Sequence, residues 1–405
     1  MIQKTFERSN AEEIIVRYKD KPVIKVLQGI RRAGKSFMLE LLAQKMRQSG
    51  IENERIVVIN FEDFENVALL DIHALYDYIK QKSEVCGGKK LYLLFDEVQE
   101  AAGWEKCVNS LYASKTIDTD IYLTGSNARF LSSELATLLS GRYVTIHIQP
   151  LSYREFLYFN GMTDSAASFR RFLTVGGFPG LKDMMDNDVQ IHAYLEGIYA
   201  TVLLKDVIAH NKIRDTDMLS RIIQYAADNV GNIFTAKRIA DFMKASGRSL
   251  SVETIYNDLQ YLQDAFILQK VQRYDIRGRK VLETLEKYYF ADHGLLFLLH
   301  GYKDTYINGI LENIVYVELL RREYTVKIGK LLDGEIDFVA ERGDERLYVQ
   351  VTYLISSEET KEREYRSLRA INDNFPKLIL SMDDLPPSND EGILRKNIRD
   401  WLLEG

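Results

Sequence analysis

The stretch Gly29-Ile30-Arg31-Arg32-Ala33-Gly34-Lys35-Ser36 decides the fold of this chain. It matches the pattern G-x-x-x-x-G-K-[ST] at every fixed position. The apolar run 23–27 before it predicts a buried strand, and residues 37–46 after it have the spacing of a helix. A strand, a glycine-rich turn and a helix in this order are the context in which the pattern forms a phosphate-binding loop.

The residue types of this stretch suit a bound nucleotide. Gly29 and Gly34 let the backbone curl closely enough for successive N–H groups to contact a phosphate. Lys35 would reach the β- and γ-phosphates, the Ser36 hydroxyl would ligate Mg²⁺, and the positive end of the following helix would lie under the anion. The residues predicted on this basis to bind ATP are Gly29, Arg31, Arg32, Ala33, Gly34, Lys35, Ser36 and Phe37.

Two further strand ends support this prediction. The apolar run 91–95 is followed directly by Asp96-Glu97, a pair of like charges that a strand end carries only at some cost. We expect Asp96 to hold the water shell of Mg²⁺ and Glu97 to polarise the attacking water as general base. The strand 120–124 is followed by Ser126-Asn127, where Asn127 would sense the γ-phosphate.

Arg142 directly precedes the last predicted strand of this region. A cation there could reach a γ-phosphate in the same or a neighbouring subunit, as an arginine finger does. An equally good interpretation is a solvated surface arginine, because one arginine at a strand edge discriminates poorly. Arg129 is a weaker candidate for the same role.

Strands and helices alternate over residues 23–149, which predicts a parallel sheet with helices on both faces. The predicted strands are 23–27, 55–61, 91–95, 120–124 and 143–149, and the helices between them include 37–46, 71–82 and 104–115. We therefore predict an α/β core at 1–150. Residues 151–210 are helical by pattern, with a break at 176–180, and would form a helical lid.

Residues 211–300 predict three helices and a β-hairpin, which is the outline of a winged helix. The exposed face of the third helix would carry Thr254, Asn257, Asp258 and Tyr261, and the basic tip of the hairpin holds Arg277, Arg279 and Lys280. Double-stranded DNA could be contacted by Asn257, Arg277, Arg279 and Lys280. Packing between domains is an equally good use of such a module.

Residues 301–405 resemble a PD-(D/E)xK nuclease core. Glu312 lies on a predicted helix, Asp337 on the strand 334–339, and Gln350 on the strand 347–352. The pattern requires a carboxylate and a lysine where Gln350 and Thr352 stand, and losing both charges weakens the binding of a hard cation. We therefore expect a degenerate nuclease-like scaffold rather than an active nuclease.

The composition is that of an ordinary globular protein, with 46% hydrophobic and 28% charged residues and a net charge of −6. The 405 residues predict two to three domains, no apolar run is long enough to span a membrane, and the two cysteines are isolated. These features predict a cytoplasmic protein. The net charge argues against a wholly electrostatic nucleic-acid binder, although one basic domain is compatible with it.

Taken together, the chain resembles the AAA+-type ATPases of bacteria and archaea that are grouped with archaeal ATPases and STAND NTPases and end in a domain of unknown function. The matching stretches are 24–36, 94–99, 123–127, 139–143, 150–156, 289–294, 312–320 and 334–351. The resemblance implies an AAA+ core, a helical lid, a winged helix and a nuclease-like end. It also implies ATP binding and hydrolysis by Lys35, Ser36, Asp96 and Glu97, with Asn127 and Arg142 as sensor and finger.

Three hypotheses follow. The first is an ATP-driven switch or motor whose winged helix contacts DNA or a partner protein. The second is a DNA nuclease regulated by ATP, and the third is a slow nucleotide-gated signalling module. A finger acting from a neighbouring subunit would require a homo-oligomer.

Overall fold

The computed structural model describes residues 8–128, 139, 141–245, 247–248, 250–301, 303–355 and 357–404. The chain forms two compact units. The first comprises Met1–Gln149 with Asp264–Phe266, and the second comprises Pro150–Gln263 with Ile267–Gly405. The first unit ends one residue before the predicted end of the sheet domain.

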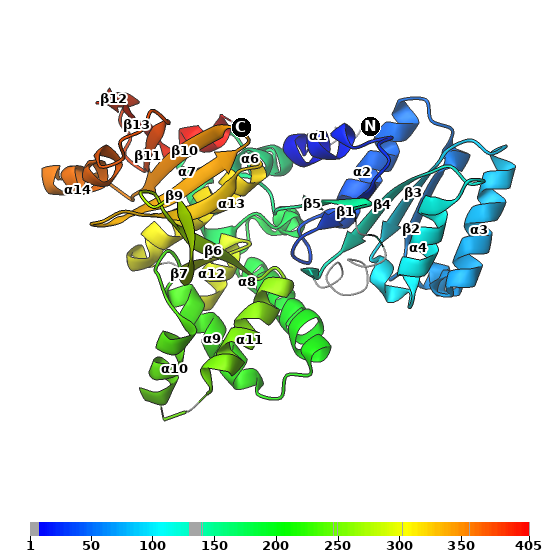
Figure 1. The fold of residues 1–405 in the computed structure, drawn as a ribbon, viewed down its shortest axis with the longest axis horizontal. Helices are drawn as coiled ribbons and strands as arrows, with labels where there is room; N and C mark the ends of the chain where they lie inside the picture. The colour runs from blue at the N-terminus through cyan, green and yellow to red at the C-terminus, as the bar shows by residue number, and fades with distance from the viewer. Residues whose placement is uncertain are drawn as a thin grey trace. The chain divides into compact units, whose positions relative to one another are not determined.

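The first unit contains a five-stranded parallel sheet with the strand order β2-β3-β4-β1-β5 (Figure 1). Its strands are β1 (Ile24–Gln28), β2 (Ile56–Asn60), β3 (Leu91–Asp96), β4 (Thr119–Gly125) and β5 (Tyr143–His147). Every residue of β1 and β3 is buried, as expected of central strands covered on both faces. The predicted α/β class is confirmed.

Helices alternate with these strands. They are α1 (Ser9–Arg17), α2 (Lys35–Gln48), α3 (Ile72–Val85) and α4 (Trp104–Ala113), with short 3₁₀ turns at Asn53–Arg55, Phe64–Leu70 and Val98–Glu100. Apolar residues of β1 to β4 pack against α3 and α4 in one core that includes Leu75, Trp104 and Leu111. This packing fixes the strand ends that carry the predicted site.

The second unit begins with helices and contains a larger sheet. Its helices are α6 (Tyr153–Asn160), α7 (Ala166–Val175), α8 (Asp188–Thr201), which continues as a π-helical segment Val202–Ala209, α9 (Thr216–Asp228), α10 (Ala236–Ala245), α11 (Val252–Asp264), α12 (His293–His300), α13 (Ile307–Arg321), α14 (Glu358–Arg369) and α15 (Ile398–Leu403). Short 3₁₀ turns lie at Pro179–Met184 and Asp304–Tyr306. The first helix starts at a capping box, in which Ser152 and Glu155 satisfy each other's backbone N–H groups.

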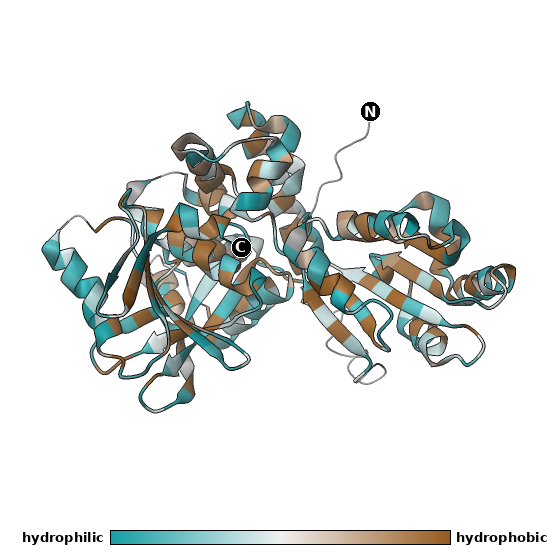
Figure 2. Cartoon of the chain, turned by 90° about the horizontal axis from the view of Figure 1, so that it is seen from above, coloured by the Kyte–Doolittle hydropathy of each residue, from teal (hydrophilic) through white to brown (hydrophobic). Residues whose placement is uncertain are grey.

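The eight-stranded sheet has the order β12-β13-β11-β10-β9-β8-β6-β7. Its strands are β6 (Leu268–Asp275), β7 (Lys280–Phe290), β8 (Thr325–Lys330), β9 (Glu335–Arg342), β10 (Glu345–Val351), β11 (Lys377–Ser381), β12 (Ser388–Asp390) and β13 (Ile393–Asn397). Figure 2 shows apolar residues along the strands of both sheets.

The predicted hairpin is present as β6 and β7, but β6 also pairs in parallel with β8 over Arg273–Asp275. The hairpin is therefore one edge of the large sheet and not a free-standing wing. The predicted boundary at 300/301 falls inside this second unit. Within the described residues, no helix has the length and apolar character that a membrane span requires.

Candidate functional site

The loop between β1 and α2 has a backbone that only glycine fits at two points. Gly29 has φ +153°, and a Cβ there would lie 2.2 Å from the carbonyl oxygen of Ile148. Gly34 caps α2 in the left-handed region at φ 99°. The N-terminus of α2, a helix of 14 residues, therefore opens directly onto the loop, and the N–H groups of a first helical turn have no carbonyl partner within the helix.

Lys35 lies inside this curl. Its side chain is almost fully buried, and Nζ donates to the carbonyl oxygens of Gly29 at 3.0 Å and Ile30 at 3.3 Å. Ser36 and Phe37 follow in the first turn of α2 and are exposed. A buried ammonium beside the positive N-terminal end of a helix is an arrangement that attracts an anion.

Asp96 and Glu97 lie at the end of β3, next to the loop. The Thr124 hydroxyl on β4 donates to Asp96 Oδ1 at 2.5 Å, and the backbone N–H of Glu97 donates to Thr124 Oγ1 at 2.9 Å. Burial raises the pKa of Asp96 above its ordinary value, and hydrogen bonds from Thr124 and Ser36 oppose this rise. A carboxylate whose charge is poorly solvated in this way would be stabilised by a bound cation.

The Glu97 side chain is held by Ser126 and Gln99, and neither bond was predicted from the sequence. Its Oε2 accepts hydrogen bonds from the Ser126 hydroxyl at 3.3 Å and from the Gln99 amide. Ser126 in turn accepts from Arg31 Nη2 at 3.4 Å, and Arg31 also pairs with Glu62. Glu97 itself has φ 50°, a left-handed conformation that non-glycine residues adopt mainly where the surroundings impose it.

The other predicted residues of this region separate into two places. Asn127 is half-buried in the turn after β4, beside Ser126. Arg142 precedes β5, and its carbonyl oxygen accepts from the N–H of Ile24, the first residue of β1. Because β1 and β5 are parallel, Arg142 lies at the N-terminal ends of these strands, whereas the loop lies at their C-terminal ends. Five residues of strand separate the two ends by about 16 Å.

The Arg142 side chain donates to Asn109 Oδ1 at 2.5 Å and lies 5.9 Å from the ring centroid of Tyr112. A finger role within the same subunit does not fit this geometry. The role toward a neighbouring subunit stays a prediction. Arg129 lies outside the described residues.

The loop fits Mg·ATP. The curl that a Cβ at Gly29 would fill, the buried Lys35 ammonium, and the Ser36 hydroxyl hydrogen-bonded to Asp96 are the donors and ligands that a triphosphate and Mg²⁺ require. Mg²⁺ at such a site takes one or two protein oxygens and completes its shell with phosphate and water.

The four predicted DNA contacts are all exposed in the second unit: Asn257, Arg277, Arg279 and Lys280. Asn257 lies on α11, and the other three lie at the turn that joins β6 and β7. The prediction that Asp258 is also exposed is wrong. It is buried, because it falls on the inner stripe of α11, and burial raises its pKa to about 6.

Glu312, Asp337 and Gln350 do come together, but around a lysine. Lys287 of β7 lies 3.4 Å from Glu312, 2.6 Å from Glu335 and 3.6 Å from Asp337. Burial alone would lower the pKa of Lys287, but the surrounding carboxylates outweigh it and raise that pKa. Sequence analysis missed Lys287 because it is 65 residues from the position at which the motif places its lysine.

The oxygens of this carboxylate cluster already have protein donors. Asp337 accepts from the N–H of Val351 at 2.8 Å, Glu312 accepts from the Tyr289 hydroxyl at 3.1 Å, and Gln350 Oε1 accepts from the N–H of Asp337 at 3.4 Å. A Cβ on Gly231 would lie 3.0 Å from Glu312. No group of three or more metal-ligating side chains suited to an ion is present in the described chain. The cluster does not fit a divalent cation.

Burial raises the pKa of Glu312 to about 8, and the neighbouring Asp337 adds to this rise. Burial also raises the pKa of Asp337 to about 6. The single Lys287 cannot neutralise all the carboxylates around it. Protonation of the carboxylates therefore reduces the remaining negative charge.

Comparisons with known proteins agree with the fold of the first unit. Residues 21–157 match a family described as an AAA domain, and residues 166–306 match a domain of unknown function. An uncharacterized protein of Haemophilus influenzae is 38% identical over 100% of both chains. An uncharacterized protein of Methanocaldococcus jannaschii is 28% identical over 93% of this chain and 85% of that protein.

Among solved structures, the Walker-type ATPase of Pyrococcus abyssi is similar, with a TM-score of 0.51 and 14% identity over 73% of this chain and 95% of that chain. At this identity the likeness concerns the fold alone. That fold, a parallel sheet with a phosphate loop after its first strand, is the P-loop AAA+ ATPase fold.

Proposed function

The chain belongs to the family of AAA-domain proteins that includes the Haemophilus influenzae protein, and we propose that it is an ATPase that binds Mg·ATP at the β1–α2 loop and hydrolyses it. One observation carries the proposal. The buried Lys35 ammonium, the Ser36 hydroxyl and the acidic pair at the end of β3 lie around one glycine-built loop.

Each residue of the site has a task in this reaction. The N–H groups of the loop and Lys35 bind the phosphates, and Ser36 and Asp96 would hold Mg²⁺. Bound Mg²⁺ supplies neutralisation of the charge that develops on the phosphate oxygens. Glu97 takes a hydrogen bond from the attacking water and orients it, while Ser126 and Gln99 fix the Glu97 carboxylate.

The test is nucleotide binding and turnover in three proteins. The wild type is expected to bind ATP and release phosphate, Lys35→Ala to lose binding, and Glu97→Gln to bind ATP while turnover falls by roughly 10²-fold or more. Retained ATP affinity in Lys35→Ala would refute the site assignment. A wild type that binds ATP tightly but turns it over hardly at all would instead favour a nucleotide-gated signalling module.

A DNA-coupled switch or motor is a second candidate, because Arg277, Arg279 and Lys280 are all exposed at one turn. Phosphate contacts of this kind weaken as salt rises. ATP turnover of the wild type and of an Arg277→Ala/Arg279→Ala variant should therefore be compared with and without double-stranded DNA, at low and physiological salt. Stimulation that the variant loses supports DNA coupling, whereas turnover indifferent to DNA points to a protein partner.

A further inference from the structure

Arg8, just before α1, is a buried arginine whose guanidinium contacts the backbone of the phosphate loop. It is only 2% exposed, its Nη1 donates to the carbonyl oxygen of Ala33 at 2.9 Å, and its Nη2 donates to the carbonyl oxygen of Gln149. Burying a guanidinium is costly unless it is hydrogen-bonded, so both carbonyls stabilise this placement.

The contact with Ala33 sets the direction of a phosphate-binding group. In a trans peptide the C=O and the following N–H point to opposite sides. Because Arg8 holds the Ala33 carbonyl on one side of the loop, the N–H of Gly34 points to the other side, where the phosphates would bind. Arg8 is therefore a positioning residue for the loop.

The loop also contacts Ile148, which lies near the C-terminal end of the first unit. The N–H of Ile148 donates to the carbonyl oxygen of Gln28 at 2.7 Å, and Gly29 is pressed against the Ile148 carbonyl. Together with the Arg8 bond to Gln149, these contacts tie the loop at both of its ends to Ile148 and Gln149. Gln149 is the last residue of the first unit before the chain continues at Pro150.

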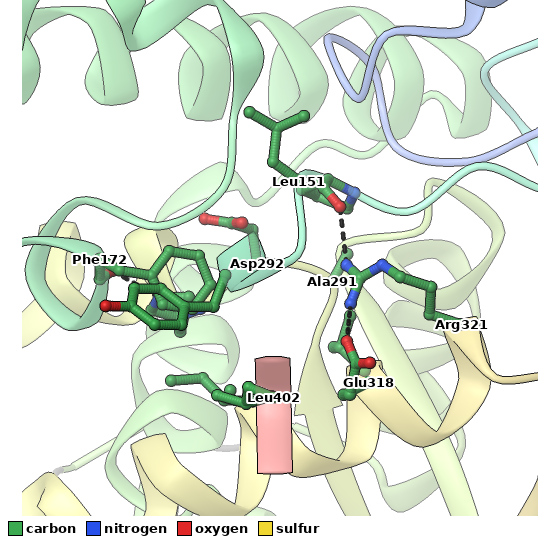
Figure 3. A pocket seen from close by; sticks show the side chains of 12 residues that line it. Leu151, Phe172, Ala291, Asp292, Glu318, Arg321 and Leu402 are labelled. Atoms are coloured by element: carbon green, nitrogen blue, oxygen red, sulfur yellow. Dashed lines mark hydrogen bonds and ion pairs between the residues drawn. The ribbon is translucent and has the colours of Figure 1, made fainter. Parts of the chain in front are cut away.

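The second unit holds its own first residues in the same manner. Arg321 of α13 donates through Nη2 to the carbonyl oxygen of Pro150 at 2.7 Å and pairs with Glu318 (Figure 3). The N–H of Leu151 donates to Gly177 at 2.7 Å, and the N–H of Gly177 donates to buried Asp292 at 2.8 Å.

Four consecutive residues, 148 to 151, thus each have a backbone hydrogen bond, two within each unit. Proline fixes its own φ and restricts the residue before it to extended conformations, so the Gln149–Pro150 connection has fewer conformations open to it than an ordinary peptide. We propose that Arg8 and Arg321 form a relay through this connection, by which the second unit senses nucleotide bound at the loop. The relay rests on the proposed function.

The test uses the full-length chain with Mg·AMP-PNP and two measurements, the nucleotide Kd by calorimetry and amide hydrogen exchange at residues 150–180. In the wild type the nucleotide is expected to slow exchange at Leu151 and Gly177 by about fivefold or more. Arg321→Met should keep the Kd within about twofold and lose this slowing, because its bond to Pro150 is gone while the loop is untouched.

Arg322→Met is the matched control. Arg322 is the next residue, pairs with the same Glu318 at 2.8 Å and lies 4.1 Å from the ring centroid of Trp401, and in the described residues no hydrogen bond joins it to Pro150. It should behave as the wild type. Arg8→Met should weaken nucleotide binding by about 10- to 100-fold, the usual range for a lost charged hydrogen bond.

Arg8→Lys retains the charge but cannot span both carbonyls, so its nucleotide affinity should fall between those of the wild type and Arg8→Met. This graded loss distinguishes a positioning role of Arg8 from general instability of the fold. Two results would overturn the relay: nucleotide binding without slowed exchange in the wild type, or slowed exchange that survives in Arg321→Met. A wild type that does not bind the nucleotide would remove the proposed function itself.

Discussion

Gly29 has no room for a side chain at the back of the phosphate loop. Because a Cβ would lie 2.2 Å from the backbone oxygen of Ile148, the loop must move away from the end of β5 to accept one. We expect Gly29→Ala to lower the free energy of unfolding by about 1–3 kcal/mol and to abolish nucleotide binding.

Chemical denaturation and ATP titration of Gly29→Ala measure the two effects. Gly50→Ala is the control, because Gly50 also has a positive φ of 89°, but a Cβ there would have no described neighbour within 4 Å. Equal losses of stability in the two variants would show that φ alone, and not the contact with Ile148, makes glycine necessary at position 29.

Ser126 links Arg31 to Glu97. Its hydroxyl orients the carboxylate, and among the described residues Arg31 is its hydrogen-bond partner from the loop. Ser126→Ala should therefore lower the kcat of ATP hydrolysis by roughly tenfold, with little change in nucleotide Kd. Ser49→Ala, which removes a hydroxyl that donates to the carbonyl oxygen of Met46, is the control. A raised Kd with unchanged kcat would contradict the role given to Ser126.

At the residue scale, the sequence predicts what is contiguous. Gly29 to Ser36 and the pair Asp96-Glu97 are recognisable because fixed spacing and a strand end bring the chemistry together along the chain. The network through Thr124, Ser126 and Arg31 depends on which strands are neighbours. Alternation predicts a parallel sheet but not that β3 lies beside β4, so these contacts had no signal in the sequence.

Strand β7 carries the lysine that holds the carboxylate cluster together. Lys287 joins β7 to α13 through Glu312 and to β9 through Glu335 and Asp337. Removing one partner of a buried ionic group leaves the others uncompensated, so Lys287→Met should lower the free energy of unfolding by about 3–5 kcal/mol. Lys280→Met, an exposed position at the start of the same strand, should change it by less than about 0.5 kcal/mol.

The same cluster gives the second unit a pH dependence. A folded-state pKa of about 8 for Glu312, above its ordinary 4.5, means that the folded chain keeps a proton that the unfolded chain releases. The free energy of unfolding should therefore fall as the pH rises from about 5 to about 8 and level off above that. Asp337, with a pKa of about 6, contributes in the same direction at lower pH.

Glu312→Gln mimics the protonated form and should flatten this curve, with a gain of at least about 1 kcal/mol over the wild type at pH 8.5. Denaturant unfolding between pH 5 and 9 measures it. Glu358→Gln, at an exposed carboxylate of α14, is the control. A wild-type stability that rises from pH 5 to 8 would contradict the protonated state assigned to Glu312.

At the element scale, the helices and strands of the first unit follow from periodicity, and so do α9 to α11 and the β9–β10 hairpin. Periodicity does not predict which strands pair with one another in a sheet. The hairpin predicted within residues 211–300 would be the wing of a winged helix, whereas the pairing of β6 with β8 makes it part of the large sheet. The lysine of the cluster was missed because it is 65 residues from the position at which the motif places its lysine, and only the fold brings β7 to Glu312 and Asp337.

At the scale of the whole molecule, two compact units each contain one tryptophan, which allows their unfolding to be followed separately. Trp104 is buried in α4 of the first unit, and Trp401 is buried in α15 of the second. The chain has two tryptophans in all, so Trp401→Phe leaves fluorescence from the first unit and Trp104→Phe leaves fluorescence from the second.

Nucleotide binding should shift these two signals differently. At 100 times Kd, a ligand stabilises its site by about 2.7 kcal/mol, which for a unit of this size is roughly 5–10 °C in Tm. We expect Mg·AMP-PNP to raise the midpoint of the Trp104 signal by that amount, and Lys35→Ala to abolish the shift. Independent units predict no change in the Trp401 signal. The arginine relay predicts a smaller rise there that disappears in Arg321→Met, because the second unit gains from nucleotide only while Arg321 holds its first residue, Pro150.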